Sequence, residues 1–283
     1  MRIKLVGVIV LVFSMASLVA EPQQEPSYAP SIRYWTDTQG SPLASEHTIP
    51  LRSDPKLLVL LYHNVVFGRT GNVYNRDLYN FENDLSFVKR NFMITNFKQL
   101  LTSSDDSRTD QAIITFDDGD LSLYAIVFPL FKAYELEATI FLVPSFIGKV
   151  GYMSWDQVSE MSDYRTADGK KLFYFESHSQ THRRMGDLSE EEIIWELQQS
   201  KQTIEEKVGE PVTILALPFG SGAGDERIIS VAYDLGYQAI RTSKPETHIL
   251  TKLNPWMIGT MNVENYSSDV LVQKVLALMG KRK

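Results

Sequence analysis

The sequence predicts an α/β fold built on a parallel sheet or a β/α barrel, and three observations lead to this. Short apolar runs recur along the chain. Amphipathic segments with a helical period separate these runs, as expected of helices that cover the faces of a parallel sheet. Candidate motifs, namely Asp117–Asp118, His178 and Phe219–Gly220, follow just after three of the runs, at the strand ends where β/α barrels carry their active sites.

The predicted strands are short and almost wholly apolar, which is typical of strands buried on both faces. Turn residues or polar residues bound each of them. They cover residues 57–61, 111–116, 138–143, 172–175, 212–215 and 237–241.

The clearest predicted helix covers residues 189–208. Ser189 lies three residues before Glu192, which forms a capping box, and Gly209 ends the helix. Further helices are predicted over residues 81–90, 124–134 and 226–235. Pro129 either kinks the second of these or marks the first turn of a separate helix.

The composition of the sequence divides the chain into three parts. Residues 1–20 combine a short basic start with a compact apolar run and small residues, the pattern of a signal peptide. Residues 21–55 hold six of the twelve prolines and form a linker or N-terminal arm. Residues 56–283 are long enough for one barrel domain. We therefore expect an exported protein, periplasmic or extracellular, without a stable membrane span in its mature form. The alternative is that residues 1–20 stay uncleaved as an N-terminal anchor, although their apolar run is shorter than the ~20 residues usual for a span.

The charge of the chain disfavours some partners. The net charge is -7, and removal of the segment that contains Arg2 and Lys4 would take it to -9. An acidic surface repels nucleic acid and anionic lipid, so we expect neither as a partner. The chain contains no cysteine, so no disulfide supports the fold.

Two aspartates follow the second predicted strand, in the segment Thr115–Gly119. Side chains of neighbouring residues on a strand point to opposite faces, but Gly119 would allow both Asp117 and Asp118 to turn toward one site. Aspartate is also common in turns and helix caps, which is the alternative for this pair. We assign Asp120 to a cap.

Two histidines, His178 and His182, follow the fourth predicted strand. On a helical turn, residues four apart lie close enough to share a metal ion. One carboxylate and two imidazoles can hold a divalent cation with a coordination position left open, and a second carboxylate can then act as a base. The pattern predicts a metal-dependent hydrolase.

The segments Thr115–Gly119 and His178–His182 resemble the first two motifs of the polysaccharide deacetylase family, also called carbohydrate esterase family 4. Leu217–Gly220 is similar to the third motif. The opening Leu61–Asn64 and the order of the elements resemble the branch with exported poly-β-1,6-N-acetylglucosamine deacetylases. The resemblance covers residues 57–241 and implies a distorted (β/α) barrel with fewer than eight full repeats.

The resemblance also implies roles for individual residues. Asp118, His178 and His182 would bind one divalent metal, most often Zn²⁺, although such a site also takes Co²⁺, Ni²⁺ or Fe²⁺. Asp117 would be the general base. The turn formed by Pro218, Phe219 and Gly220 would contact the substrate, with the backbone N–H of Phe219 toward the oxyanion.

The sequence departs from the family pattern at two places. Many members carry an arginine before the proline of the third motif, which orients the base, but this chain has Ala216 and Leu217 there. The late Leu-x-His motif, which supplies the general acid, is not recognisable. We favour His63, at the end of the first strand, as a catalytic residue near the leaving group. We expect the other candidate, His248, to be exposed.

These patterns favour a metal-dependent hydrolase that removes acetyl groups from an extracellular or cell-wall polysaccharide of the N-acetylglucosamine type. The expected partner is an acetylated glycan. The alternative is a non-catalytic carbohydrate-binding protein that retains the metal site, although such a protein has no need of Asp117 as a base. A phosphatase that uses Asp117 as a nucleophile fits less well, because that chemistry does not need the paired histidines.

Overall fold

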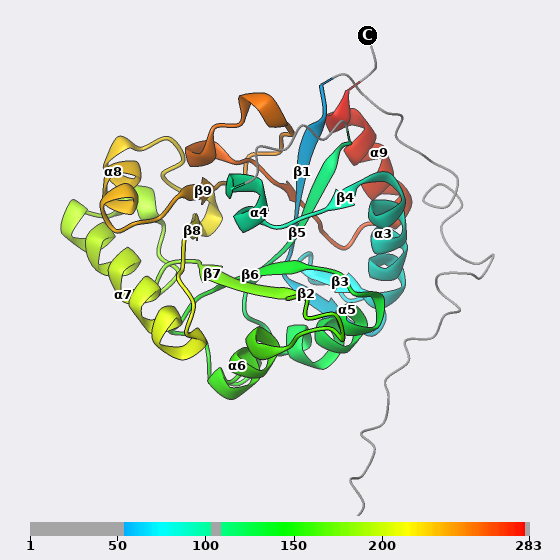
Figure 1. Ribbon diagram of the computed structural model, residues 1–283, viewed down its shortest axis with the longest axis horizontal. Helices are drawn as coiled ribbons and strands as arrows, with labels where there is room; N and C mark the ends of the chain where they lie inside the picture. The colour runs from blue at the N-terminus through cyan, green and yellow to red at the C-terminus, as the bar shows by residue number, and fades with distance from the viewer. Residues whose placement is uncertain (1–53, 103–108, 281–283) are drawn as a thin grey trace, which may run out of the picture.

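A computed structural model of the chain describes residues 54–102 and 109–280 (Figure 1). The predicted signal segment, residues 1–20, lies outside the described residues, as does all of the predicted arm except residues 54 and 55. Within the described ranges, no helix combines the length and the apolar character needed to cross a membrane.

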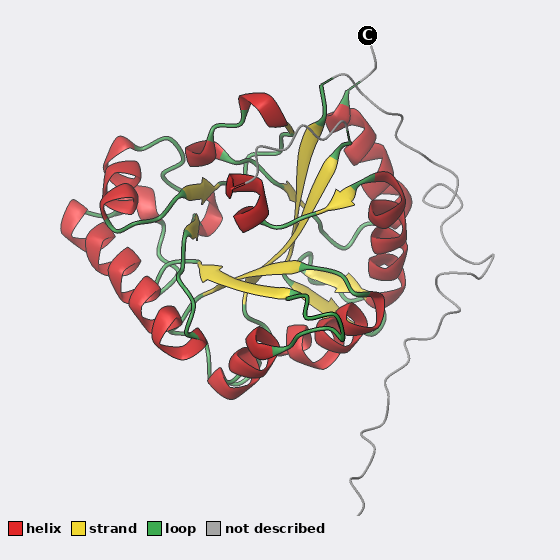
Figure 2. Ribbon diagram, viewed as in Figure 1, coloured by secondary structure: helices red, strands yellow, loops and turns green. Residues whose placement is uncertain are grey.

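The described residues fold around one curled sheet whose main strands run parallel (Figure 2). All six predicted strands are confirmed, and their bounds differ from the prediction by no more than two residues. In their order across the sheet they are β1 (Lys56–Tyr62), β5 (Gln111–Asp118), β6 (Ala138–Leu142), β7 (Phe173–Ser177), β8 (Ile214–Ala216) and β9 (Ala239–Arg241).

Short strands complete the sheet. Arg241 in β9 pairs with Ile258, and β11 (Met261–Asn262) pairs with β1. Residues 258–262 therefore connect β9, the last of the six main strands, back to β1. The predicted distorted barrel with fewer than eight full repeats is thereby confirmed. The short strands β4 (Met93–Ile94) and β10 (His248–Ile249) also belong to this sheet, whereas β2 (Asn64–Val66) and β3 (Asn75–Asp77) pair with each other in a separate two-stranded sheet.

Helices surround the barrel, and α4 lies in front of its interior in the view of Figure 1. Pro129 lies in the first turn of α5, after a π-helical turn, which confirms the second of the two predicted possibilities. The capping box of Ser189 and Glu192 opens α7 as predicted, and Gly209 caps its end. The helices are α3 (Leu78–Asn91), α4 (Phe97–Thr102), α5 (Phe128–Tyr134), α6 (Trp155–Asp163), α7 (Glu190–Val208), α8 (Glu226–Asp234) and α9 (Ser268–Met279).

Alternation along the strands determines which side chains enter the barrel. A small apolar cluster that includes Leu57, Val59, Ile113, Ala216 and Ala239 fills the interior, whereas a larger cluster lies between the sheet and the helices. Side chains two residues apart on a strand share a face. The inward-facing residues of each strand therefore form a row, which the next residues toward the carboxyl end of the strand extend. His63 continues the β1 row, Asp117 the β5 row and Arg241 the β9 row.

Candidate active site

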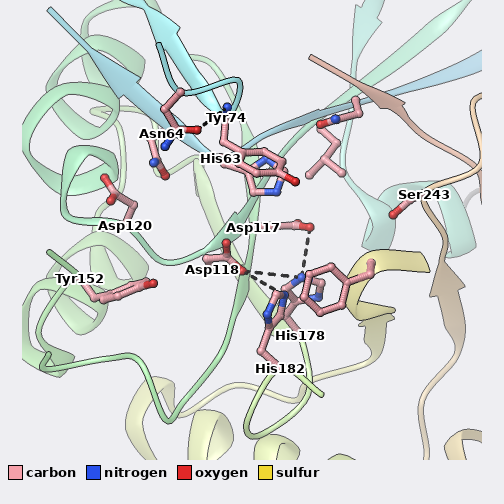
Figure 3. A pocket seen from close by; sticks show the side chains of 14 residues that line it. His63, Asn64, Tyr74, Asp117, Asp118, Asp120, Tyr152, His178, His182 and Ser243 are labelled. Carbon is pink, nitrogen blue, oxygen red and sulfur yellow. Dashed lines mark hydrogen bonds and ion pairs between the residues drawn. The ribbon is translucent and has the colours of Figure 1, made fainter. Parts of the chain in front are cut away.

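A cavity of about 430 Å³ opens at the carboxyl ends of the strands (Figure 3). The residues singled out from the sequence that line it come from four separate segments of the chain. They are His63, Asp117, Asp118, His178, His182 and Phe219. The barrel therefore gathers distant motifs around one hollow, at the edge of the sheet where β/α barrels carry their active sites.

The backbone at the end of β5 allows two neighbouring carboxylates to line the same cavity. Asp118 adopts a φ of 72°, and Gly119 follows with a φ of 86°. A left-handed conformation at a residue other than glycine costs about 1–3 kcal/mol and is concentrated at functional sites. This turn reverses the alternation expected of a strand, so that Asp117 and Asp118 both line the cavity.

The two histidines lie in a loop after β7, and the predicted helical turn is wrong. Ser179 and His182 have φ values of 61° and 63°, so the loop curls tightly and brings the centres of the two imidazole rings to 4.9 Å. The buried carboxylate of Glu196 in α7 holds this loop, since it accepts hydrogen bonds from the backbone N–H and the hydroxyl of Thr181.

Asp118, His178 and His182 offer three potential metal ligands. One ligand atom from each lies within 4.8 Å of the others. Oδ1 of Asp118 lies 3.8 Å from Nε2 of His178 and 3.5 Å from Nε2 of His182, and this buried oxygen has no hydrogen-bond partner within residues 54–102 and 109–280. Two imidazole nitrogens and a carboxylate oxygen are ligands that zinc accepts, so the residues present fit a divalent cation.

The surroundings of His178 prepare it to bind a cation. Its Nδ1 lies 2.8 Å from the carbonyl oxygen of Ala216, which can only accept a hydrogen bond, so Nδ1 carries the proton and Nε2 keeps its lone pair. Burial lowers the pKa of His178 to about 3, even though Asp117 favours its protonation. The ring is therefore neutral across the physiological range.

The pKa of Asp118 is higher than that of Asp117. Burial, and then the negative charge of Asp117, raise the pKa of Asp118 to about 6. Burial also acts to raise the pKa of Asp117, but the neighbouring Arg241, followed by His178 and His63, outweighs it and holds this pKa below its usual range. The two adjacent carboxyl groups are thus separated in acidity by their different neighbours.

Arg241 is a residue of the site that the sequence analysis missed. Its fully buried guanidinium donates a hydrogen bond to Oδ1 of Asp117, so a buried cation does accompany the expected base. It reaches Asp117 from β9, whereas the family pattern places the arginine just before the proline that is Pro218 in this chain. The signal was available in the sequence, because an arginine at the end of an apolar strand needs a buried partner.

The turn of the third motif borders the cavity. Phe219 has a φ of 58° and is 59% exposed, and its ring centre lies 4.6 Å from that of His182. Gly220 follows with a φ of 65°, which strains any other residue, and a Cβ there would lie only 3.0 Å from Cβ of Ser243. Pro218 is buried behind the turn. This geometry presents the Phe219 ring, and not a polar side chain, at the rim.

The two candidate histidines for the leaving group lie at opposite ends of β1. His63 lines the cavity, and its ring centre lies 4.7 Å from that of Tyr74. Its Nδ1 is buried and meets no hydrogen-bond partner in the described part of the chain. His248 lies in register with Leu57 at the amino end of β1, and its Nε2 accepts a hydrogen bond from the backbone of Gly259. The prediction that His248 is exposed is wrong, because β10 half-buries it far from the cavity.

Asp120 has both a structural contact and a place at the cavity. Its Oδ1 accepts a hydrogen bond of 2.8 Å from the backbone N–H of Ser122, as expected of a residue that caps the following turn. It also lines the cavity, opposite the histidine loop in Figure 3.

The fold and these motifs define a class of protein, and comparison with known families identifies it. Residues 104–240 match the sequence model of the polysaccharide deacetylase family. The chain therefore carries a polysaccharide deacetylase domain, which confirms the resemblance seen in its motifs.

Curated relatives are similar over part of their length. YxkH of Bacillus subtilis, which is named for the same family, is 26% identical over 194 residues, or 67% of this chain and 65% of that protein. The poly-β-1,6-N-acetyl-D-glucosamine N-deacetylase of Staphylococcus aureus is 26% identical over 118 residues, 38% of this chain and 39% of that one. The chain thus spans less than two thirds of either relative.

Solved structures share the fold. The Streptococcus pyogenes deacetylase PplD, solved with acetate, has a TM-score of 0.68 at 17% identity and matches 79% of this chain and 100% of its own. IcaB from Ammonifex degensii has a TM-score of 0.65 at 18% identity and matches 83% of this chain and 100% of its own. At these identities the likeness establishes the barrel and not the substrate.

The pair of Arg241 and Asp117 predicts a pH-dependent effect on stability. Arg241→Met leaves a buried carboxylate without its cation, which costs about 3–5 kcal/mol. The ionised form of Asp117 stabilises the wild-type fold above the usual carboxyl range, and this contribution is lost as the pH falls through the lowered pKa. We expect the deficit in the free energy of unfolding, measured by urea denaturation, to be greatest at neutral pH and to shrink in acid.

Two further variants control this measurement. Arg184→Met removes an exposed arginine that pairs with Asp187, and should change stability by at most about 1 kcal/mol. Adding Asp117→Asn to Arg241→Met should recover part of the loss. A deficit that is constant with pH, or effects that simply add, would contradict the ion-pair account.

Proposed function

We propose that this protein is a metal-dependent hydrolase that removes acetyl groups from an extracellular or cell-wall polysaccharide of the N-acetylglucosamine type. The observation that carries the proposal is the convergence of Asp117, Asp118, His178 and His182 on one cavity of a polysaccharide deacetylase domain. The relative from Staphylococcus aureus, named as an N-deacetylase of such a polymer, supports the substrate class.

Asp118, His178 and His182 would hold the cation, with Zn²⁺ favoured and Co²⁺, Ni²⁺ or Fe²⁺ as alternatives. A divalent cation bound there would act as a Lewis acid, which polarises the acetyl carbonyl and makes water more acidic. Two hydrogen bonds keep the nitrogen ligands oriented. Nδ1 of His178 donates to the carbonyl of Ala216, and the backbone N–H of Thr181 in the histidine loop donates to Glu196.

Asp117 is suited to be the general base. Its Oδ1 is engaged by Arg241, and Oδ2, which lies 3.3 Å from Nε2 of His178, is the atom left to take a proton from the attacking water. Its pKa below the usual range keeps it ionised at neutral pH, and its burial fixes its orientation. A positioned base of this kind contributes about 10²- to 10⁴-fold to the rate.

The turn at residues 218–220 borders the cavity beside His182. The backbone N–H of Phe219 would stabilise the negative charge that develops on the acetyl oxygen, since backbone donors commonly do so in acyl transfer. The exposed ring of Phe219, beside His182, offers an apolar surface for a sugar ring. Gly220 permits the tight turn that brings both groups to the rim.

His63 would donate the proton that the leaving nitrogen needs. It lies at the end of β1 on the same cavity as Asp117, and its positive charge when protonated would favour the ionised forms of both aspartates. An amine is a poor leaving group until it is protonated, so a proton from His63 would allow the bond between the acetyl carbon and the nitrogen to break.

We infer that the protein acts outside the cytoplasm, on an acetylated glycan. The basic and apolar pattern of residues 1–20 supports export, and the acidic net charge of -7 disfavours nucleic acid as a partner.

Acetate release from N-acetylglucosamine oligomers tests the proposed function. We expect release by the wild-type protein loaded with Zn²⁺ and its loss after chelation. Asp117→Asn should lower kcat by about 10²- to 10⁴-fold while the bound metal remains, because the base is lost and the three proposed metal ligands stay in place. Asp118→Ala should lose the metal as well, as measured by elemental analysis of the dialysed protein.

Other results would count against the proposal. Release that survives chelation, or no release from any acetylated glycan, would exclude a metal-dependent deacetylase. Glycan binding without turnover, unchanged by Asp117→Asn, would favour a binding protein that retains the metal.

The acidity of Asp118 predicts how metal binding responds to pH. Below its pKa of about 6 a proton competes with the cation, so the affinity for Zn²⁺ should fall about tenfold for each further unit of pH. His178, with a pKa of about 3, stays neutral and adds nothing in this range. At pH 5, well below the pKa of about 7 of zinc-bound water, calorimetry in buffers of different ionisation enthalpy should detect about one proton released as zinc binds. No proton release at pH 5 would show that Asp118 is not a ligand.

The proposed role of His63 predicts a dependence on the leaving group. His63→Ala should slow release from N-acetylglucosamine oligomers by about 10²-fold or more, but should scarcely affect 4-nitrophenyl acetate, whose leaving group needs no proton. His248→Ala removes a histidine at the far end of β1 and serves as the control, with both rates unchanged. Equal slowing of the two substrates by His63→Ala would mean that His63 does not act as the acid.

A further inference from the structure

Three residues that line the cavity carry a buried side-chain atom without a hydrogen-bond partner among the described residues. These atoms are Nδ1 of His63, Oδ1 of Asp118 and Oδ1 of Asn262. A buried acceptor that has lost water and found no donor is unfavourable, and native proteins hold few of them. The proposed metal accounts for Asp118 and the proposed proton transfer for His63. Asn262 remains without an explanation.

The orientation of the Asn262 amide is determined by its neighbour. Nδ2 of Asn262 donates to Oε1 of Glu264 at 3.4 Å. A carboxylate only accepts hydrogen bonds, so the amide nitrogen faces Glu264 and the oxygen faces away from it. The backbone carbonyl of Glu264 in turn accepts a bond of 3.1 Å from Arg76, whose buried guanidinium pairs with Asp84. The amide of Asn262 is therefore oriented by the half-buried Glu264, whose backbone is anchored by the buried pair of Arg76 and Asp84.

Asn262 lies on the same face of the sheet as His63, the residue proposed to protonate the leaving nitrogen. In the parallel pair of β11 and β1, Asn262 is in register with Leu61, two residues before His63. Side chains in register on neighbouring strands point to the same side, and residues two apart on a strand share a face. Leu61, His63 and Asn262 accordingly all line the cavity.

We propose that Asn262 determines specificity by accepting a hydrogen bond from the N–H of the substrate's acetamido group. An N-acetyl group has this donor next to the bond that breaks, whereas an O-acetyl ester has none. A site built to pair with a substrate N–H rejects an analogue that lacks it, because its own buried acceptor then stays unpaired. The site would thus take N-acetylated sugars in preference to O-acetylated ones. This inference rests on the proposed function.

The test compares two classes of substrate in the zinc-loaded protein. Asn262→Leu keeps the approximate shape of the side chain and removes the acceptor. We expect kcat/KM for N-acetylglucosamine oligomers to fall by about ten- to hundredfold, while that for O-acetylated xylan oligomers changes by less than about threefold. Circular dichroism and a thermal melt verify that the variant is folded.

A swapped pair provides the matched control. Asn262→Asp together with Glu264→Gln keeps the same net charge and similar shapes, and returns an acceptor oxygen to position 262 with an amide donor beside it. This double variant should retain most of the N-acetyl preference that Asn262→Leu loses. If it is as impaired as Asn262→Leu, the acceptor is not what matters and the inference fails.

The remaining outcomes separate this inference from the proposed function. Equal losses on both substrates, as expected if Asn262 binds a sugar hydroxyl or only supports the fold, would overturn the inference, and so would no loss on either. If the wild type releases acetate from none of these glycans, the proposed function fails. Calorimetric binding of the two oligomers then decides the contact: an N-acetyl preference abolished by Asn262→Leu supports it, and equal or absent binding overturns it.

Discussion

Asp117 and Asp118 are consecutive residues, and a regular strand would direct their side chains to opposite faces of the sheet. The site depends on the reversal of that rule at the end of β5, where Asp118 takes a φ of 72°. Ser179, His182 and Phe219 also have positive φ values, and they lie in the other loops that border the cavity. Such strain persists only where the surrounding structure imposes it, so the barrel supports the conformations that its site requires.

The charges of the site depend on the interior of the barrel. Arg241 enters from β9 beside the small side chain of Ala216, and its guanidinium lies 4.8 Å from the ring centre of Phe141 before it meets Asp117. This buried cation keeps Asp117 ionised, whereas its neighbour Asp118 holds a proton more tightly. Two adjacent carboxyl groups can therefore take different roles, as a base and as a ligand whose proton a cation displaces.

Local patterns in the sequence predicted the barrel strands, the helix caps and the positions of the motifs, because burial on both faces and capping act over a few residues. The positive φ values of Ser179 and His182 were not predictable, because the histidine spacing alone suits a helical turn equally well. Arg241 and Asn262 were missed for another reason. Their roles arise from contacts across the barrel and with neighbouring strands, and no spacing in the sequence reports which charge or amide will meet which partner.

The central claim is that Asp118, His178 and His182 hold one divalent cation in this cavity. X-ray absorption spectroscopy of the zinc-loaded protein tests it most directly. The account predicts one tightly bound zinc per chain with two imidazole nitrogens at about 2.0–2.1 Å and a carboxylate oxygen at about 2.0–2.2 Å. It further predicts that this spectrum disappears when His178 and His182 are both replaced by alanine. A chain that binds no zinc, or a spectrum unchanged by those replacements, would contradict the claim.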